Sequence, residues 1–73
     1  MITQLQLCGI ARAGGSIVVD AEKYTALGLK GVAATLRNGA TITIKNARRF
    51  SALQCEDIAS VAPLGHVVFD FSQ

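Results

Sequence analysis

The sequence predicts an α/β fold: a three-unit helix–strand solenoid with a three-stranded parallel sheet and all helices on one face. The prediction depends on a short pattern that occurs three times: a Ser or Thr, apolar residues two and four positions later, an Ile/Val-Ala pair, a Gly and an alternating strand. Self-similarity at a period of roughly 20–50 residues is typical of stacked repeats. We expect a single repeat domain over residues 1–73, with units at about 2–23, 24–49 and 50–73.

Each unit should begin with a capped helix. The helices are expected at about residues 3–13, 25–37 and 51–62. Their N-cap residues, whose side-chain oxygens accept from first-turn amides, are Thr3, Thr25 and Ser51. Gln6 and Gln54 stand three residues after their caps and predict capping boxes, whereas the middle unit has Gly28 there. The apolar residues before the caps predict hydrophobic staples: Ile2, Tyr24 and Phe50.

Small residues mark where the helices end and where they pack. Glycines are expected to stop the three helices at Gly15, Gly39 and Gly65. Alanines at one corresponding position of each helix predict close contact with a neighbouring helix: Ala11, Ala33 and Ala59.

An alternating strand follows each helix, and the strands repeat every 25 residues. One set of side chains is expected to face the helices: Ile17, Ile42 and Val67, then Val19, Ile44 and Phe69. Strands joined by a helix must be parallel. The sequence therefore predicts one parallel sheet.

The other side of the sheet is expected to be uncovered and to carry three rows of side chains. Together with two loop arginines they form the candidate interaction surface: Val18, Asp20, Thr41, Thr43, Lys45, Arg48, Arg49, His66, Val68 and Asp70. The row Asp20–Lys45–Asp70 has three interpretations. It is a salt-bridge ladder that fixes the register, part of a recognition stripe or, with the least support because no cleft is expected around it, a catalytic acid–base pair.

The third strand is apolar and is expected to be an uncovered sheet edge. Its candidate oligomer-edge residues are Val67, Phe69 and Phe71. Unpaired edges favour strand pairing with another chain. Composition points the same way, because 51% of the residues are hydrophobic and 16% are charged, while so short a chain buries only about 60% of its surface on folding. We expect a homo-oligomer, a dimer above other states, or a complex with a different protein.

The favoured function is a non-catalytic interaction or assembly module. Neither a metal-ligand spacing nor a nucleophile motif occurs, so no catalytic residue and no cofactor is expected. The net charge of +2 and the absence of Trp make nucleic acid an unlikely partner. The alternative is a nucleic-acid or phosphate-binding accessory protein that uses Arg48, Arg49, Lys45 and Arg37. A small metal-dependent enzyme around Asp20, Asp70 and His66 has the least support.

The two cysteines and the first residues bear on the compartment. Cys8 and Cys55 belong to no C-x-x-C or Cys/His pair, which favours a reducing environment, although a disulfide between them stays open. Gln4 and Gln6 interrupt the first apolar residues, so we expect no signal peptide. No apolar run is long enough to span a bilayer. A cytoplasmic protein without membrane contact is therefore expected.

Residues 40–46, with alternating aliphatic side chains and a closing Asn46, resemble the strand segment of a leucine-rich repeat. The three units share the layout of that family. They depart from its L-x-x-L-x-L-x-x-N pattern, since Asn46 comes one residue early and Ala21 and Phe71 occupy the corresponding positions. The resemblance implies recognition through the open strand face and no catalytic residues.

Overall fold

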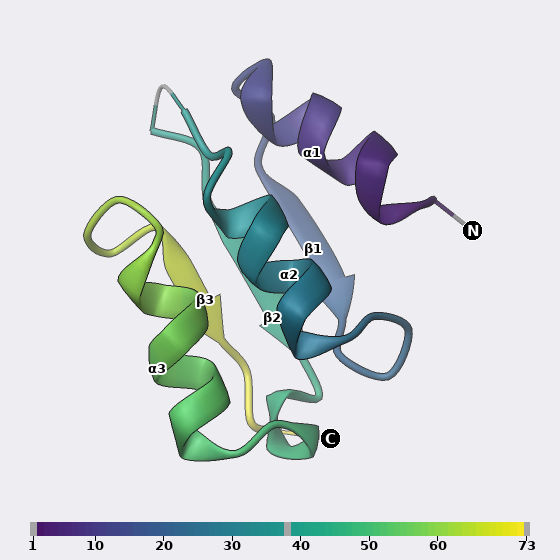
Figure 1. The fold of residues 1–73 in the computed structure, drawn as a ribbon, viewed down its shortest axis with the longest axis vertical. Coiled ribbons are helices and arrows are strands. Elements are labelled where there is room, and N and C mark those ends of the chain that lie inside the picture. Colours follow the sequence, from purple (N-terminus) through teal and green to yellow (C-terminus); the bar gives the residue numbers. More distant parts are fainter. Residues whose placement is uncertain (1, 38, 73) are drawn as a thin grey trace.

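The computed structural model describes residues 2–37 and 39–72 (Figure 1). The elements in chain order are α1 (Gln4–Arg12), β1 (Ile17–Asp20), α2 (Ala26–Ala33), β2 (Ile42–Lys45), the 3₁₀ helix η1 (Ala47–Arg49), α3 (Ala52–Ser60) and β3 (Val67–Phe69). The strands form one open parallel sheet in the order β1-β2-β3. The helices lie side by side on one side of it (Figure 1). The mixed α/β prediction is confirmed, while the solenoid stays a prediction.

The predicted N-caps are confirmed in all three helices. The Thr3 hydroxyl accepts from Gln6 N, and the Gln6 side chain accepts from Thr3 N in return. Ser51 and Gln54 make the same reciprocal pair. Thr25 accepts from Gly28 N at 2.9 Å. The middle helix lacks the reciprocal bond because Gly28 has no side chain with which to return it.

Helix α2 ends at Ala33, earlier than the expected residue 37. The amides of Thr35 and Leu36 donate to the carbonyls of Val32 and Ala33, which tightens the chain into turns. The Thr35 hydroxyl also donates to Val32 O at 2.7 Å. A side chain that competes for helical carbonyls in this way favours termination.

The predicted glycine stops are wrong in two units and shifted by one residue in the first. Helices α2 and α3 end at Ala33 and Ser60, with right-handed C-caps at Ala34 and Val61, so Gly39 and Gly65 lie in the turns before β2 and β3. Gly39 and Gly65 have φ of 78° and 76°, the left-handed region in which a Cβ is costly. In the first unit the positive φ, 97°, belongs to Gly14 and not to Gly15. Gly15 is needed for space, since a Cβ there would lie 2.8 Å from Ile10 Cγ2. The adjacent glycines therefore divide two roles that the sequence assigned to one.

The predicted 25-residue register is confirmed on both sides of β2. Ile42 pairs with Ile17 and with Val67, and Ile44 pairs with Val19 and with Phe69. Both β2 isoleucines are completely buried between the sheet and the helices. The core thus centres on the middle unit, with α2 above it.

The helices approach one another closely through small residues. Gln4 of α1 lies over Gly28 and Gly31 of α2, where an added Cβ would come within 3.0–3.2 Å of its amide. Lys30 and Asp57 form an ion pair of 3.0 Å between α2 and α3. Ala11 and Ala33 are fully buried as expected, but the prediction for Ala59 is wrong. Ala59 is exposed because α3 is the outermost helix on its side of the described layer.

Candidate interaction surface

The uncovered face of the sheet carries the middle row of the candidate surface. Val18, Thr43 and Val68 are register partners on the three strands. The two valines are exposed and Thr43 is half-buried. Neighbouring strands lie about 4.8 Å apart, so the three side chains form a continuous strip. This strip offers apolar contact without any reactive group.

Hydrogen bonds fix the row at the amino-terminal ends of the strands. Thr41 N donates to Ser16 Oγ at 3.0 Å. His66 Nδ1 lies 2.9 Å from Ala40 O, and because a carbonyl oxygen only accepts, we assign the proton to Nδ1. The ring of His66 is half-buried and holds the turn before β3 to the turn before β2. The role of this row in the described structure is to connect the strands.

The row at the carboxyl-terminal ends is not a salt-bridge ladder. Lys45 makes no ion pair within 4.0 Å with Asp20 or Asp70. Asp20 Oδ1 instead accepts from Asn46 Nδ2 at 2.9 Å and from Glu22 N at 2.8 Å. These bonds, the Asn46 bond foremost, lower the pKa of Asp20. The ladder interpretation is therefore wrong, because amide donors are better placed than the exposed Lys45 ammonium.

Asp70 is satisfied within its own turn. The Ser72 hydroxyl and the Ser72 amide both donate to Asp70 Oδ1, the amide at 2.9 Å. The pKa of Asp70 is lowered, with the hydroxyl bond as the largest cause. The two carboxylates of this row thus accept hydrogen bonds from different donors, while the charge of Lys45 contributes to the lowered pKa of both.

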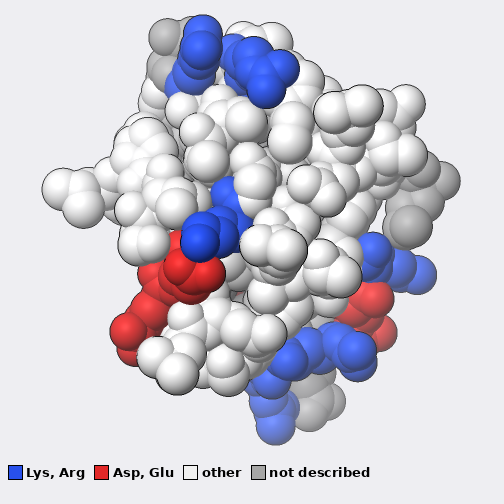
Figure 2. All heavy atoms as spheres, in the orientation of Figure 1, with Lys and Arg blue, Asp and Glu red and all other residues white. Residues whose placement is uncertain are grey.

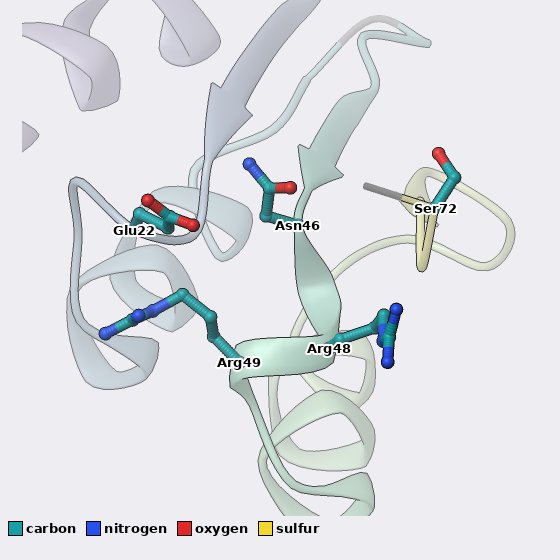
Figure 3. Close-up of a pocket in the computed structure, with 5 residues that line it drawn as sticks. All are labelled: Glu22, Asn46, Arg48, Arg49 and Ser72. Carbon is teal, nitrogen blue, oxygen red and sulfur yellow. The ribbon is translucent and has the colours of Figure 1, made fainter.

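A shallow hollow of about 280 Å³ lies where the loops after the strands meet (Figure 3). Its lining residues are Glu22, Asn46, Arg48, Arg49 and Ser72. Ligands often bind outside the carboxyl ends of parallel strands. Here, however, the guanidinium of Arg49 extends toward the Glu22 side of the hollow and that of Arg48 extends the opposite way (Figure 3). The two arginines therefore do not converge on a single anion.

Asn46 positions the two arginines. Its φ of 57° places it in the left-handed region, which Asn tolerates better than most residues. The chain therefore turns sharply after β2 into η1, the short helix that ends with Arg48 and Arg49. The bond from its side chain to Asp20 ties this turn to the end of β1.

The β3 edge has apolar side chains, and some of its backbone groups have no hydrogen-bond partner among residues 2–37 and 39–72. Ile42 N donates to His66 O and Asp70 N donates to Ile44 O, so these β3 backbone groups face β2. By alternation, the amides and carbonyls of Val67 and Phe69 point outward. Phe69 stacks on Phe71 with ring centroids 6.2 Å apart, and Phe71 remains 52% exposed. All three candidate edge residues are thus accessible at least in part.

A second apolar feature, which the sequence analysis missed, lies at the opposite edge. Side chains around the outer side of β1 enclose an open hollow of about 370 Å³. It is lined by Ile2, Leu7, Val18, Val19, Asp20, Lys23 and Tyr24. The Tyr24 hydroxyl donates to Ile2 O, so two of the residues that line this hollow are hydrogen-bonded to each other. The only signal in the sequence was the apolar residue before each cap, here Ile2 and Tyr24.

The outer surface of the helices also has an unexpected feature. The second residue of each helix is a leucine with most of its side chain in solvent: Leu5 (82% exposed), Leu27 (77%) and Leu53 (76%). We call these residues the leucine row. Figure 2 shows the helix-covered side, where basic groups lie near the top and the bottom of the view, basic and acidic groups lie together left of centre, and uncharged surface surrounds them. The sequence contained this recurrence, but not the outward direction of the side chains.

The residues expected to bind nucleic acid or phosphate do not lie together, and neither do those of the expected metal-dependent enzyme. Each group is divided between opposite ends of the sheet. Arg37 precedes β2, whereas Lys45, Arg48 and Arg49 lie at or beyond its carboxyl end. His66 likewise precedes β3 and Asp70 follows it. Four residues of strand separate such positions by about 13 Å. Within residues 2–37 and 39–72, no three His, Cys, Asp or Glu side chains are grouped to hold a metal ion.

The two cysteines do not form a disulfide. Cys8 on α1 is half-buried, Cys55 on α3 is buried, and both are free thiols. Burial raises the pKa of Cys55, as expected for a cysteine that replaces a core leucine. The raised pKa disfavours the reactive thiolate form of Cys55.

Comparisons with protein-family models, with curated proteins and with solved structures found no match for this chain. Among the described residues, no helix has both the length and the apolar character required to cross a membrane. The leucine-rich-repeat resemblance and the expected cellular location both stay predictions.

Proposed function

We propose that this chain is a non-catalytic interaction module that associates with another protein chain, first of all with a second copy of itself, through an edge of its sheet. The observation that carries the proposal is the β3 edge. Its outward-pointing amides at Val67 and Phe69 adjoin apolar side chains at Val68 and Phe71. An edge strand with apolar flanks provides both the hydrogen bonds and the buried area that strand addition requires.

The proposal includes the stacked-repeat architecture. The shared cap position, the shared register and the parallel strands support a short solenoid of helix–strand units. Solenoids use extended surfaces to bind partners, and their end units decide whether the stack stays soluble. A module of this kind needs no reacting groups, which suits the satisfied carboxylates at the ends of β1 and β3.

The proposal is tested by light scattering coupled to size exclusion, from micromolar to millimolar protein. We expect the wild type to associate and Phe71→Asp to shift it toward monomer, because a charge would be buried beside the β3 edge. The matched control is Leu27→Asp, which also places a carboxylate at an exposed apolar position. In the first turn of α2 this carboxylate is compatible with the helix dipole.

The control should keep the wild-type mass at every concentration. A wild type that remains a folded monomer up to millimolar concentration would overturn the proposed self-association. Equal loss of association in both variants would move the contact from the sheet edge to the helical surface.

A further inference from the structure

We infer that copies of this chain associate head to tail, with β3 of one copy adding in parallel to β1 of the next. The inference rests on the proposed function and goes further, since it names both surfaces and their order. A contact between β3 and β1 leaves one edge free on each end and can continue into longer assemblies, whereas a contact between two β3 edges stops at the dimer. The inference can therefore fail while the proposed self-association stands.

The backbone groups of the two edges are complementary. Ile17 N donates to Thr41 O and Ala21 N donates to Lys45 O, so these β1 residues face β2. The amides of Val18 and Asp20 consequently point outward. In a parallel ladder, each residue bonds to the two positions that flank its register partner.

If Val67 aligns with Ile17 of the next copy, Val67 bonds to its residues 16 and 18, and Phe69 to its residues 18 and 20. Those are the residues whose groups face outward on β1. The β3-to-β1 contact would thus continue the same register that joins β1 to β2 and β2 to β3.

The helices carry the second complementarity. The seventh residue after each N-cap is apolar, and it is buried in α2 (Val32, 0% exposed) and α3 (Ile58, 1%) but open in α1 (Ile10, 39%). The eighth residue is buried in α1 and α2 but exposed at Ala59 of α3. The uncovered members of the two sets lie on the outermost helices at opposite sides of the layer. Placing α3 of one copy beside α1 of the next would cover Ala59 and Ile10 together.

The third complementarity is one of shape and apolar character. The Phe69–Phe71 stack stands at the carboxyl end of the β3 edge. The apolar hollow beside β1 includes Val19 and Tyr24 and so lies at the same height on the other edge. In the continued register, Phe69 pairs with Val19, which brings the aromatic stack to this hollow. Phe69 itself packs partly against the core, so the half-exposed Phe71 is the member of the stack that would enter the hollow. An apolar group that fits a hollow elsewhere on the same molecule is characteristic of a heterologous contact.

Two carboxylates and two lysine side chains would lie near this contact. Asp70 would adjoin Asp20 of the next copy, which is unfavourable for two carboxylates. Lys23 lies in the β1 hollow and already lowers the pKa of Asp20 by its charge. It would therefore adjoin both carboxylates, with Lys45 on the neighbouring strand as a further positive charge.

The test uses two edge-blocking variants, alone and mixed. Proline removes an outward amide, so Val18→Pro blocks β1 and Val67→Pro blocks β3, while neither amide serves the internal ladder. We expect the wild type to form a concentration-dependent series beyond the dimer, since a heterologous contact need not close. Each variant alone should stay monomeric, and an equimolar mixture should form a one-to-one heterodimer.

The remaining outcomes distinguish a symmetric contact from the head-to-tail contact. A wild-type dimer that Val67→Pro abolishes and Val18→Pro leaves intact means a symmetric β3–β3 contact, which overturns the head-to-tail inference and keeps the proposed function. A wild-type dimer that Val18→Pro abolishes and Val67→Pro leaves intact means a symmetric β1–β1 contact. That result also overturns the head-to-tail inference and keeps the proposed self-association through a sheet edge. A folded wild-type monomer at millimolar concentration overturns both.

A second pair of variants applies if circular dichroism shows that a proline variant does not fold. Ile10→Glu and Ala59→Glu place charges at exposed positions on the two outer helices. The same pattern is expected: each alone weakens association at least about tenfold, and the mixture forms a heterodimer through the unmodified surfaces. Leu27→Glu on the leucine row serves as the control and should assemble like the wild type.

Discussion

The strands β2 and β3 have nearly the same pattern but very different surroundings. Ile42 and Ile44 of β2 are fully buried, whereas their partners Val67 and Phe69 on β3 are only partly covered. The difference comes from position alone, because β2 has a strand on each side and β3 has one. The comparison teaches that an apolar strand pattern shows which side chains can be buried, and that the position of the strand in the sheet decides how far this chain buries them.

The largest expected effect compares these two strands directly. Ile44→Ala should lower the free energy of unfolding by about 3 kcal/mol, because it leaves a cavity in a closed core. Phe69→Ala should cost only about 1–2 kcal/mol in the monomer, since its ring is already partly in solvent. Urea unfolding at low protein concentration measures both. Equal losses would mean that β3 is as enclosed as β2 and would contradict the comparison.

A smaller effect is expected at the helix caps. Ser51→Ala removes the acceptor for Gln54 N in the outer helix α3 and should cost about 1 kcal/mol. Ser51→Gly should cost only a few tenths, because glycine adopts the extended N-cap backbone without restraint. Thermal unfolding of both variants provides the measurement. If the glycine variant is the less stable of the two, the cap is not what holds the start of α3.

The smallest effect concerns the carboxylates of Asp20 and Asp70, and it depends on pH. Both Asp20 and Asp70 have a pKa below the ordinary value of 3.8. A group whose pKa is lower in the folded state stabilises that state above its unfolded pKa, and the contribution is lost as the pH falls through the folded value. Stability should therefore decline as the pH drops through 3.8 and below.

Asn46→Gly separates the two carboxylates, because it keeps the left-handed backbone and removes only the donor to Asp20. Carboxyl-carbon NMR titration should then show a higher pKa for Asp20 and an unchanged one for Asp70. An unchanged Asp20 titration would mean that the Asn46 bond is not the main cause of its shift.

Much of the fold could be predicted because local signals coincide with the global arrangement. Thr3, Thr25 and Ser51 set the helix starts through short-range bonds, and the 25-residue spacing sets the register. The end of α2 was missed because the bond from the Thr35 hydroxyl to Val32 competes with the helix. Periodicity does not reveal such competition.

The candidate surface could be predicted less well. The pattern assigns the same environment to Ala33 and Ala59, yet only Ala33 has a helix on both sides of its own. The row of Asp20 and Lys45 was placed correctly, but its chemistry was not, since a neutral donor from Asn46 takes the carboxylate. The hollow beside β1 depends on Tyr24 reaching across to Ile2, a contact between residues that no short motif connects.

The order β1-β2-β3 also leads us to expect a particular order of folding events. Ladders form only between strands that are consecutive in the sequence, β1 with β2 and β2 with β3. Forming either ladder therefore requires closing one helix-containing connection, and the two connections have the same length. The edge strands have no ladder with each other, and both wait for β2. The loop-closure entropy lost on folding is then about the same for the two ladders. We expect the transition state for folding to centre on α2 and β2, with α1 and β3 joining late.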